Sequence, residues 1–249
     1  MTPDGELYRR GIATLIASWQ ACARGSPGAA VVRSPGVAAA VFPAGPERAY
    51  YNNAVLERGL AAAGRAAALE AMAAAYLDAG VPRFAAWVHE SDAAMRGDLE
   101  ARGYTLDDST LAMGMDLSGI RRPRPHLDLA PPDWAEYLRI IGVPPGLLSS
   151  ANRGEFRVLI ARLDGAGAAA AMTLDCAGDC GIYNVATMSW AQRRGLATAL
   201  TAVLAHDAAA RGCRTASLQS TPVAERVYGA IGFRDLGRIL EYVPAVSTG

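Results

Sequence analysis

The sequence of 249 residues contains no lysine, so arginine supplies all 24 of its cationic side chains. Aspartate and glutamate also total 24, and the formal net charge is 0. A protein that binds nucleic acid without sequence preference needs excess positive charge to neutralise phosphates. The short basic run Arg121-Arg-Pro-Arg124 does not supply such an excess. We therefore expect no nucleic-acid partner.

Long apolar runs are also missing. No stretch reaches the roughly 20 apolar residues that a helix needs to cross a bilayer. The start of the chain, Met1-Thr-Pro-Asp-Gly-Glu6, has neither the basic nor the apolar region of a secretory signal. These absences predict a cytoplasmic protein with no membrane partner.

Cysteine and histidine are scarce. Four thiols in a chain of this length suit a reducing compartment better than a disulfide framework; they are Cys22, Cys176, Cys180 and Cys213. The closest pair flanks an Ala-Gly-Asp segment typical of a turn, and the three histidines are scattered. This pattern does not resemble a set of metal ligands, and we expect no metal.

Hydrophobic residues make up 51% of the chain, which is typical of a globular protein. Proline and arginine interrupt the apolar pattern from Ser118 to His126, and two further prolines follow at Pro131 and Pro132. Such a stretch favours a solvated linker. We predict two domains, residues 1–118 and 132–249, joined by a linker at 119–131.

The second half predicts helices and strands in alternation. Residues 132–138 begin a helix, and Leu196 to Ala210 places Leu196, Leu200 and Leu204 on one helical face. A third helix is expected at 222–230. Strands are expected at 156–160, 166–174, 182–187, 215–218 and 239–243, the second and third forming a hairpin. This order predicts an α/β or α+β fold with a mixed sheet flanked by helices.

The first half repeats this order. Helices are expected at 7–23, 65–78 and 92–102, and strands at 28–32, 37–42, 49–55 and 83–88. Glu100-Ala-Arg-Gly-Tyr104 corresponds to Gly229-Ala-Ile-Gly-Phe233 in the second half. The correspondence indicates a duplicated fold unit.

The segment Val185-Ala-Thr-Met-Ser-Trp-Ala-Gln-Arg-Arg-Gly-Leu-Ala-Thr198 carries the most chemistry. A strand ends there, a short loop with two arginines and a glycine follows, and an amphipathic helix begins. The start of a helix presents unpaired N–H groups with partial positive charge, which suit a phosphate. Gly195 alone is equally well explained by close packing.

This half resembles the GNAT superfamily of acyl-CoA-dependent N-acetyltransferases over about residues 128–245. Two motifs carry the resemblance. The first is [Gln/Arg]-x-x-Gly-x-[Gly/Ala], here Gln192-Arg-Arg-Gly-Leu-Ala197. The second is Ala-x-x-x-Tyr-x-x-x-Gly-Phe, here Ala224 to Phe233 with the tyrosine at Tyr228. The resemblance implies two tandem domains, each a mixed, mostly antiparallel sheet flanked by helices. It also implies acetyl-CoA as co-substrate.

The resemblance also implies roles for particular residues. Backbone groups of Val185, Ala186 and Thr187 would pair with the pantetheine arm and the acyl carbonyl. The pyrophosphate would lie on the loop formed by Gln192, Arg193, Arg194, Gly195, Leu196, Ala197 and Thr198. Tyr228 would be the general acid that protonates the departing sulfur. Thr221 stands where the family often has an asparagine that contacts the pantetheine arm.

Besides Thr221, two further features depart from the family. The glutamate base that many members carry early in the fourth strand is replaced here by Gly181 and Ile182. In the first half, Leu99 occupies the position of Tyr228, and Leu56 to Gly64 does not fit the loop motif. Leucine cannot protonate a thiolate, so we interpret the first half as a degenerate copy.

We therefore expect an N-acetyltransferase that moves an acetyl group to a primary amine of a small molecule by direct attack in a ternary complex. The acceptor site is expected to involve residues 132–152. The alternative is a non-catalytic acyl-CoA-binding sensor or assembly module, favoured by the missing glutamate. Oligomeric state, including a homodimer, is left open by the sequence.

Overall fold

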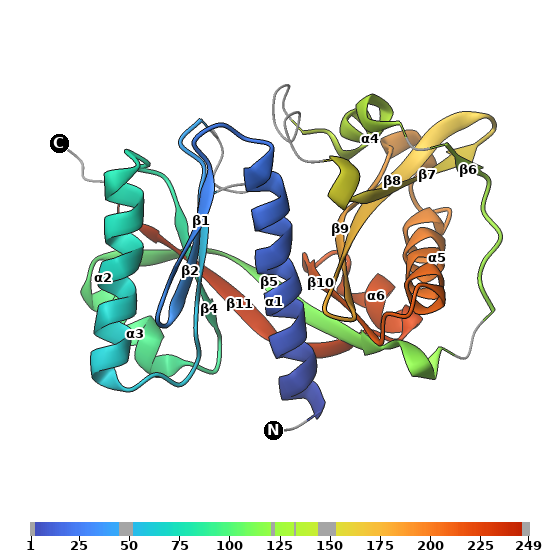
Figure 1. The fold of residues 1–249 in the computed structure, drawn as a ribbon. Coiled ribbons are helices and arrows are strands. Elements are labelled where there is room, and N and C mark those ends of the chain that lie inside the picture. The colour runs from blue at the N-terminus through green and yellow to red at the C-terminus, as the bar shows by residue number, and fades with distance from the viewer. Residues whose placement is uncertain (1–2, 45–51, 121–122, 132, 144–152, 246–249) are drawn as a thin grey trace. The chain divides into compact units, whose positions relative to one another are not determined.

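A computed structural model of the chain describes residues 3–44, 52–120, 123–131, 133–143 and 153–245. These residues pack into two compact units (Figure 1). Unit 1 comprises residues 1–18 and 111–236, and unit 2 comprises residues 19–110 and 237–249. Three elements have residues in both units: α1 (Pro3–Arg24), β5 (Tyr104–Asp116) and β11 (Arg234–Pro244).

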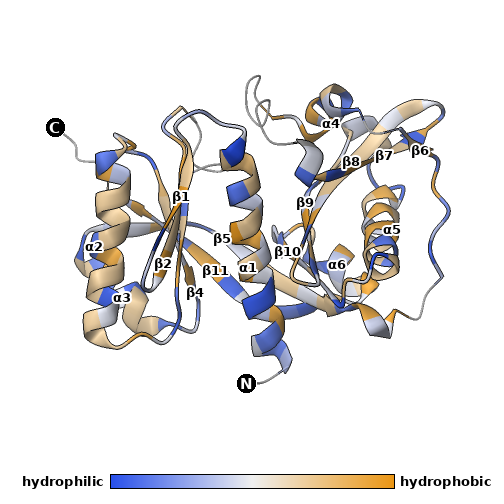
Figure 2. Ribbon diagram, in the orientation of Figure 1, coloured by the Kyte–Doolittle hydropathy of each residue, from blue (hydrophilic) through white to orange (hydrophobic). Residues whose placement is uncertain are grey.

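In unit 2 the strands of the sheet follow the order β1-β2-β3-β4-β11. Its first four strands are Ala30–Ser34, Val37–Val41, Asn53–Leu56 and Ala85–His89. Neighbouring strands are antiparallel except β3 and β4, which are parallel. Helix α2 (Ala62–Asp78) packs against β2 and α3 (Ala93–Ala101). In Figure 2 the alanine-rich α2 is coloured mostly as apolar, and it buries Leu69, Met72 and Tyr76.

Unit 1 contains a mixed sheet in the order β5-β10-β9-β8-β7-β6. Strands β6 to β10 are Leu129–Ala130, Arg157–Leu163, Ala166–Cys176, Asp179–Thr187 and Thr215–Ser220. Only the β9–β10 pair is parallel among these described neighbours. The helices are α4 (Trp134–Ile141), α5 (Leu196–Ala210) and α6 (Glu225–Ile231), and short 3₁₀ turns lie at Leu117–Gly119, Arg153–Glu155 and Ser189–Ala191.

Each sheet is completed by a strand from the other half of the sequence. In unit 1, β10 pairs with β5, with Thr215 opposite Asp116. In unit 2, β4 pairs with β11, with Ile239 opposite His89. The predicted fold class, two tandem domains with mixed, mostly antiparallel sheets and flanking helices, is confirmed. The domain limits 1–118 and 132–249 stay a prediction, because units defined by packing and repeated copies are different divisions of a chain.

Local chemistry explains several element boundaries in unit 1. Asp133 caps α4 by accepting a hydrogen bond from the Glu136 N–H at 2.9 Å, and Gly142 ends that helix in the left-handed region. Ala177 and Gly178 both have positive φ angles and close the β8–β9 hairpin. The core buries the apolar face of α5, including Leu200 and Leu204, as the helical spacing predicts.

The structure differs most from the predicted elements at α6 and β5; the short strand β6 was also not predicted, and other boundaries move by a few residues. Helix α6 begins at Glu225 rather than at Pro222, because Thr221 to Ala224 form a turn. Strand β5 was not predicted, and its 13 residues change from exposed to buried along the strand. Because the surroundings of this strand change along its length, its sequence has no single alternation of apolar and polar residues.

Two glycines bring α1 close to the unit 1 sheet. A Cβ atom at Gly11 would lie 2.9 Å from the Ser217 Cβ, and one at Gly114 would lie 3.3 Å from the Leu7 Cβ. Both contacts are closer than a larger residue tolerates without movement. The first turns of α1 are therefore held against β5 and β10.

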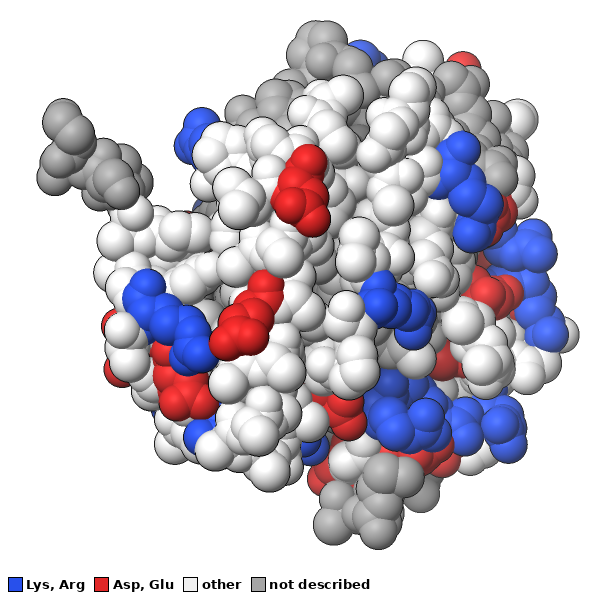
Figure 3. Space-filling model, turned by 60° about the vertical axis from the view of Figure 1, so that its left-hand side comes forward, with Lys and Arg blue, Asp and Glu red and all other residues white. Residues whose placement is uncertain are grey.

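None of the described helices is long and apolar enough to cross a membrane. On the face drawn in Figure 3, arginines and acidic side chains lie interspersed rather than in one basic area. Among the described residues no group of three or more histidine, cysteine and acidic side chains could hold a metal ion.

Candidate functional site

The candidate site starts where two parallel strands of unit 1 part. Residues Thr215–Ser217 of β10 pair with Asp179–Gly181 of β9, and the pairing then stops. Both strands continue: β9 runs on to Thr187 beside β8, and β10 runs on to Ser220 beside β5. The backbone of β9 beyond Gly181 therefore lacks a ladder partner from β10. Val185, Ala186 and Thr187 lie on this part of β9 and are half-buried.

A bulge shapes the same stretch of β9. The pairing register with β8 shifts between Ala170 and Met172, opposite Asn184, whose φ is +54°. Asparagine tolerates this left-handed conformation better than most residues. Its side-chain amide donates a hydrogen bond to the Tyr137 hydroxyl of α4 at 3.0 Å. This contact fixes the strand end to the helix that begins the predicted acceptor region.

The predicted phosphate loop is exposed from Gln192 to Gly195. The Gln192 amide donates to the Thr187 carbonyl at 3.4 Å and ties the loop to the end of β9. Arg193 and Gly195 have φ angles of +60° and +75°. A positive φ is costly for arginine, and such strain persists where the surrounding structure imposes it. Neither Arg193 nor Arg194 has an ion pair or hydrogen bond to another described residue.

Helix α5 begins directly after this loop. Gly195 is the N-cap and supplies no side-chain hydrogen bond, and the first helical bond runs from Ala199 N–H to the Gly195 carbonyl at 2.9 Å. The N–H groups of Leu196, Ala197 and Thr198 therefore precede the first intrahelical partner. The N-terminal start of α5 thus combines unpaired N–H donors, the positive end of the helix dipole and the two arginines of the preceding loop.

Tyr228 lies on α6, which packs against α5. Its side chain is buried to 7% exposure, and its ring lies 6.2 Å from that of Phe233 in an edge-to-face arrangement. The hydroxyl makes no hydrogen bond to another described residue. Burial raises the pKa of Tyr228 to about 12, so the phenol holds its proton at neutral pH.

Two polar groups complete the description of the site. Thr221 is exposed in the turn after β10, where its carbonyl accepts hydrogen bonds from Ala224 N–H and the Ser220 hydroxyl. The Thr187 hydroxyl is buried and has no hydrogen-bond partner among the described residues. An unpaired buried hydroxyl is costly, and a ligand or water group that paired with it would remove that cost.

Comparison with protein families fits this geometry. The model described as the acetyltransferase (GNAT) domain matches residues 147–242. The matched range contains the parting strands, the loop, α5 and α6. Residues 147–242 form a GNAT acetyltransferase domain.

Solved structures share the fold of the whole chain. A GCN5-related N-acetyltransferase from Kribbella flavida superposes with a TM-score of 0.71 at 18% identity, covering 95% of this chain and 97% of its own. One from Sphaerobacter thermophilus gives 0.61 at 16% identity, covering 94% and 91%. A tandem GNAT protein from the clavulanic acid biosynthesis pathway gives 0.56 at 16% identity, covering 94% of each chain. No protein among the curated sequences matches this chain.

The corresponding loop of unit 2 is arranged differently from that of the GNAT domain. Gly59, like Gly195, has a φ of +75°, but its N–H is taken by the Asp92 carboxylate at 3.0 Å. Arg65 pairs with Asp98 at 2.6 Å and donates to the Leu60 carbonyl. In unit 2 the Gly59 N–H and the Arg65 guanidinium therefore have partners within the unit, whereas the Gly195 N–H and the arginines beside it have none among the described residues. Leu99, at the position matching Tyr228, is fully buried on α3.

Sequence reasoning did not single out Asn184 and Tyr137. Their hydrogen bond joins residues 47 positions apart, and no local sequence pattern predicts such a contact. The positive φ of Asn184 lies at a strand interior, where the alternating pattern alone predicted a regular strand. Of the predicted acceptor region, residues 132 and 144–152 lie outside the described residues.

Proposed function

We propose that this protein transfers an acetyl group from acetyl-CoA to a primary amine of a small molecule, by direct attack in a ternary complex. The observation that carries the proposal is the exposed loop Gln192–Gly195, which leads into an uncapped helix beside parted strands. Backbone donors at a helix start suit a pyrophosphate, and Arg193 and Arg194 add positive charge.

The chain offers a group for each change of charge in the reaction. As the amine nitrogen bonds to the thioester carbon, negative charge develops on the carbonyl oxygen. A backbone N–H of β9 beyond Gly181, where β10 no longer pairs, would stabilise that charge. As the carbon–sulfur bond breaks, the Tyr228 phenol would give its proton to the sulfur. No covalent enzyme intermediate or metal is needed.

The missing base is compatible with this scheme. Gly181 and Ile182 carry no titratable group where many family members have glutamate. An amine that reaches the site already neutral needs no side-chain base before the attack, and water can accept its proton afterwards. The same absence supports the alternative, a sensor or assembly module that binds acyl-CoA without turnover.

One assay separates the two functions. Protein and acetyl-CoA are mixed with a panel of small primary amines, and release of the CoA thiol is measured alongside mass spectrometry of the amines. Calorimetry measures acetyl-CoA binding in parallel. Transfer to at least one amine is expected. Tight acetyl-CoA binding with no transfer to any amine of a broad panel would favour the sensor.

A further inference from the structure

Unit 1 contains a pocket that the acetyl-transfer proposal does not use. Its volume is about 550 Å³, within the range typical of small-molecule sites. Its lining comes from four parts of the chain: the first turns of α1, the end of β5 with the turn after it, the junction of α5 and β10, and Arg234. All of these residues belong to unit 1.

This pocket lies far from the candidate acetyl-CoA loop. Ala209, one residue before the end of α5, lines it, whereas the loop precedes Leu196 at the other end of that helix. A rise of about 1.5 Å per residue puts these two ends of α5 roughly 20 Å apart. The pocket is also at the start of β10, at Thr215, where β9 and β10 are still paired. It is therefore a separate site.

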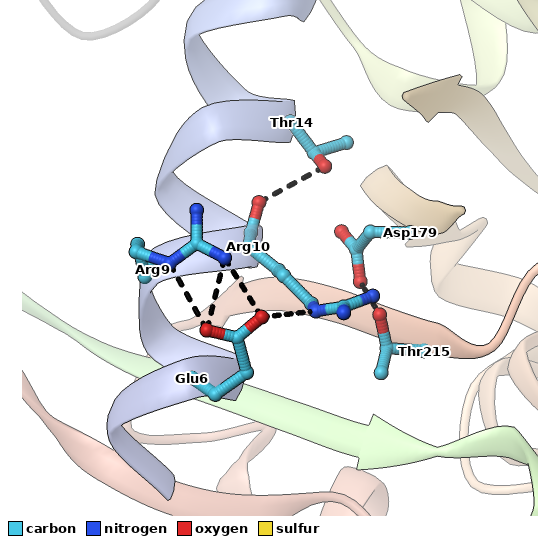
Figure 4. Close-up of polar contacts among 6 residues, drawn as sticks. All are labelled: Glu6, Arg9, Arg10, Thr14, Asp179 and Thr215. Carbon is cyan, nitrogen blue, oxygen red and sulfur yellow. Dashed lines mark hydrogen bonds and ion pairs between the residues drawn. The ribbon is translucent and has the colours of Figure 1, made fainter. Parts of the chain in front are cut away.

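Five charged side chains line the pocket. Arg10, Arg214 and Arg234 are cations, and Glu6 and Asp116 are anions. Figure 4 shows Glu6 and Arg10 extending from α1, and a dashed line joins the buried Asp179 carboxylate to Thr215. The Asp179 carboxylate accepts hydrogen bonds from Thr215 at 2.6 Å and Ser217 at 2.7 Å. It is thereby satisfied within the sheet.

The two pocket carboxylates are already well supplied with donors. Glu6 accepts bonds from both Arg9 and Arg10 at 2.7–3.0 Å. These arginines lower the pKa of the Glu6 carboxyl to about 2. Asp116 accepts from the Ser118 N–H and hydroxyl at 2.9 and 2.7 Å, which lower its pKa. Neither acid needs a cationic ligand.

The three guanidinium groups, by contrast, leave most of their N–H donors without a partner among the described residues. Arg10 uses its Nε–H on Glu6, and Arg234 uses one terminal nitrogen on Asp4 at 2.8 Å. The Arg214 side chain has no ion pair or hydrogen bond to another described residue. Each guanidinium carries five N–H donors. Asp116 keeps one oxygen, Oδ2, without a bond to another described residue, but the three guanidinium groups together keep more unused donors than the two carboxylates keep unused acceptors.

We propose that this pocket binds a small organic anion, whose carboxylate or phosphate group pairs with Arg214, Arg10 and Arg234. Arginine suits such oxyanions because its planar fork can make two parallel hydrogen bonds. Leu7, Leu117 and Ala209 supply apolar walls for a short carbon body. The inference does not depend on acetyl transfer, since no residue of the pocket belongs to the proposed acetyl-CoA site.

Calorimetry at low ionic strength tests this site with two probes, succinate for a carboxylate and glycerol 3-phosphate for a phosphate ester. The protein carries Gly195→Glu, which puts a carboxylate beside the backbone donors of the acetyl-CoA loop, so that this loop does not account for binding of an anion. We expect one probe to bind, and its identity selects the anion class. Adding Arg214→Gln should weaken that binding about tenfold, because one charge-assisted contact is lost.

The matched control is Arg226→Gln, which removes an exposed arginine of α6 outside the pocket. It should leave the affinity unchanged. Arg234→Gln provides a second pocket variant and should also weaken binding. The proposal is overturned if neither probe binds, if Arg214→Gln and Arg234→Gln bind as well as the parent, or if Arg226→Gln weakens binding equally.

Discussion

Tyr228 is the residue on which the proposed chemistry depends most. Its ring packs edge-to-face against Phe233, so replacement by phenylalanine keeps this contact and removes only the hydroxyl. Tyr228→Phe should lower kcat about 100-fold, the smaller end of the range for general acids, while acetyl-CoA still binds. Steady-state kinetics and calorimetry on the same preparation measure both quantities.

The pH dependence of kcat provides a second test of Tyr228 as the general acid. Because burial raises the pKa of Tyr228 to about 12, the acid stays protonated and available until the pH approaches that value. The wild-type kcat should therefore show no loss from deprotonation of this group between pH 7 and 10. A decline in that interval that vanishes in Tyr228→Phe would contradict the pKa argument, and unchanged turnover in the variant would remove Tyr228 from the acid role.

Asn184 tests whether the strand bulge depends on one residue. Asn184→Gly keeps the left-handed conformation easily but loses the bond to Tyr137, which should cost about 0.5–1.5 kcal/mol of unfolding free energy. Asn184→Val adds a β-branched side chain at positive φ, and the strain should cost about 1–2 kcal/mol more. Urea denaturation compares the variants. Equal stabilities of the two variants would show that backbone conformation is not the constraint.

At the scale of elements, α5 was predicted most accurately. The range 196–210 agrees with the structure because glycines stand on both sides of it, Gly195 at its start and Gly212 beyond its end, each with positive φ. The loop before it could be recognised from Gln192, Gly195 and Ala197 in the motif. Whether Arg193 and Arg194 have partners among the described residues, and the pairing of the Gly59 N–H with Asp92, depend on tertiary contacts that local sequence does not specify.

An ion pair joins the C-terminal end of α5 to β8. Arg211, the C-cap of α5, makes two hydrogen bonds to the Asp175 carboxylate of β8, at 2.7 and 2.8 Å. Burial is the largest influence and acts to raise the pKa of Asp175. The hydrogen bonds from Arg211, Cys180 and Cys213, together with the charge of Arg211, outweigh it, and the pKa is lowered. Folding stability from this pair is therefore present above the ordinary aspartate pKa and is lost as the pH falls through the lowered value.

Arg211→Gln should therefore destabilise the protein by about 1–2 kcal/mol at pH 7, and by much less at a pH below the lowered pKa of Asp175. Urea titrations at the two pH values measure the difference. Arg157→Gln is the matched control, because Arg157 is 3.9 Å from the same carboxylate and largely exposed. A loss of stability in Arg211→Gln that is equal at both pH values would contradict the assignment to ion pairing.

At the scale of the whole molecule, the exchange of β5 and β11 is the feature that sequence reasoning missed. Each strand follows a helix–Gly–aromatic segment of one half, Gly103-Tyr104 or Gly232-Phe233, yet completes the sheet built by the other half. Repeats in sequence order reveal the duplication, since both copies keep the same local pattern. They cannot reveal which copy a shared strand pairs with, because that choice is made by long-range pairing.

The exchange predicts that residues 132–249 do not fold alone. This fragment lacks β5 and with it the buried side chains Leu111, Met113 and Met115, each worth about 1.5–3 kcal/mol. Such a loss is comparable with the whole stability of a domain. Circular dichroism and size-exclusion chromatography should show an unfolded or aggregated fragment. Folding as a stable monomer would contradict the role assigned to β5, and co-expression with residues 1–131 should restore solubility.

The most direct test of the central claim is calorimetric titration of acetyl-CoA into Gly195→Glu and Gly59→Glu. Both glycines have a φ of +75° and open space where a Cβ would lie, so the two substitutions impose the same backbone cost. They differ in that Gly195 precedes open helix donors, whereas the N–H of Gly59 already pairs with Asp92. We predict that Gly195→Glu abolishes measurable binding and that Gly59→Glu binds like the wild type. Normal affinity in Gly195→Glu would contradict the assignment of the pyrophosphate to this loop.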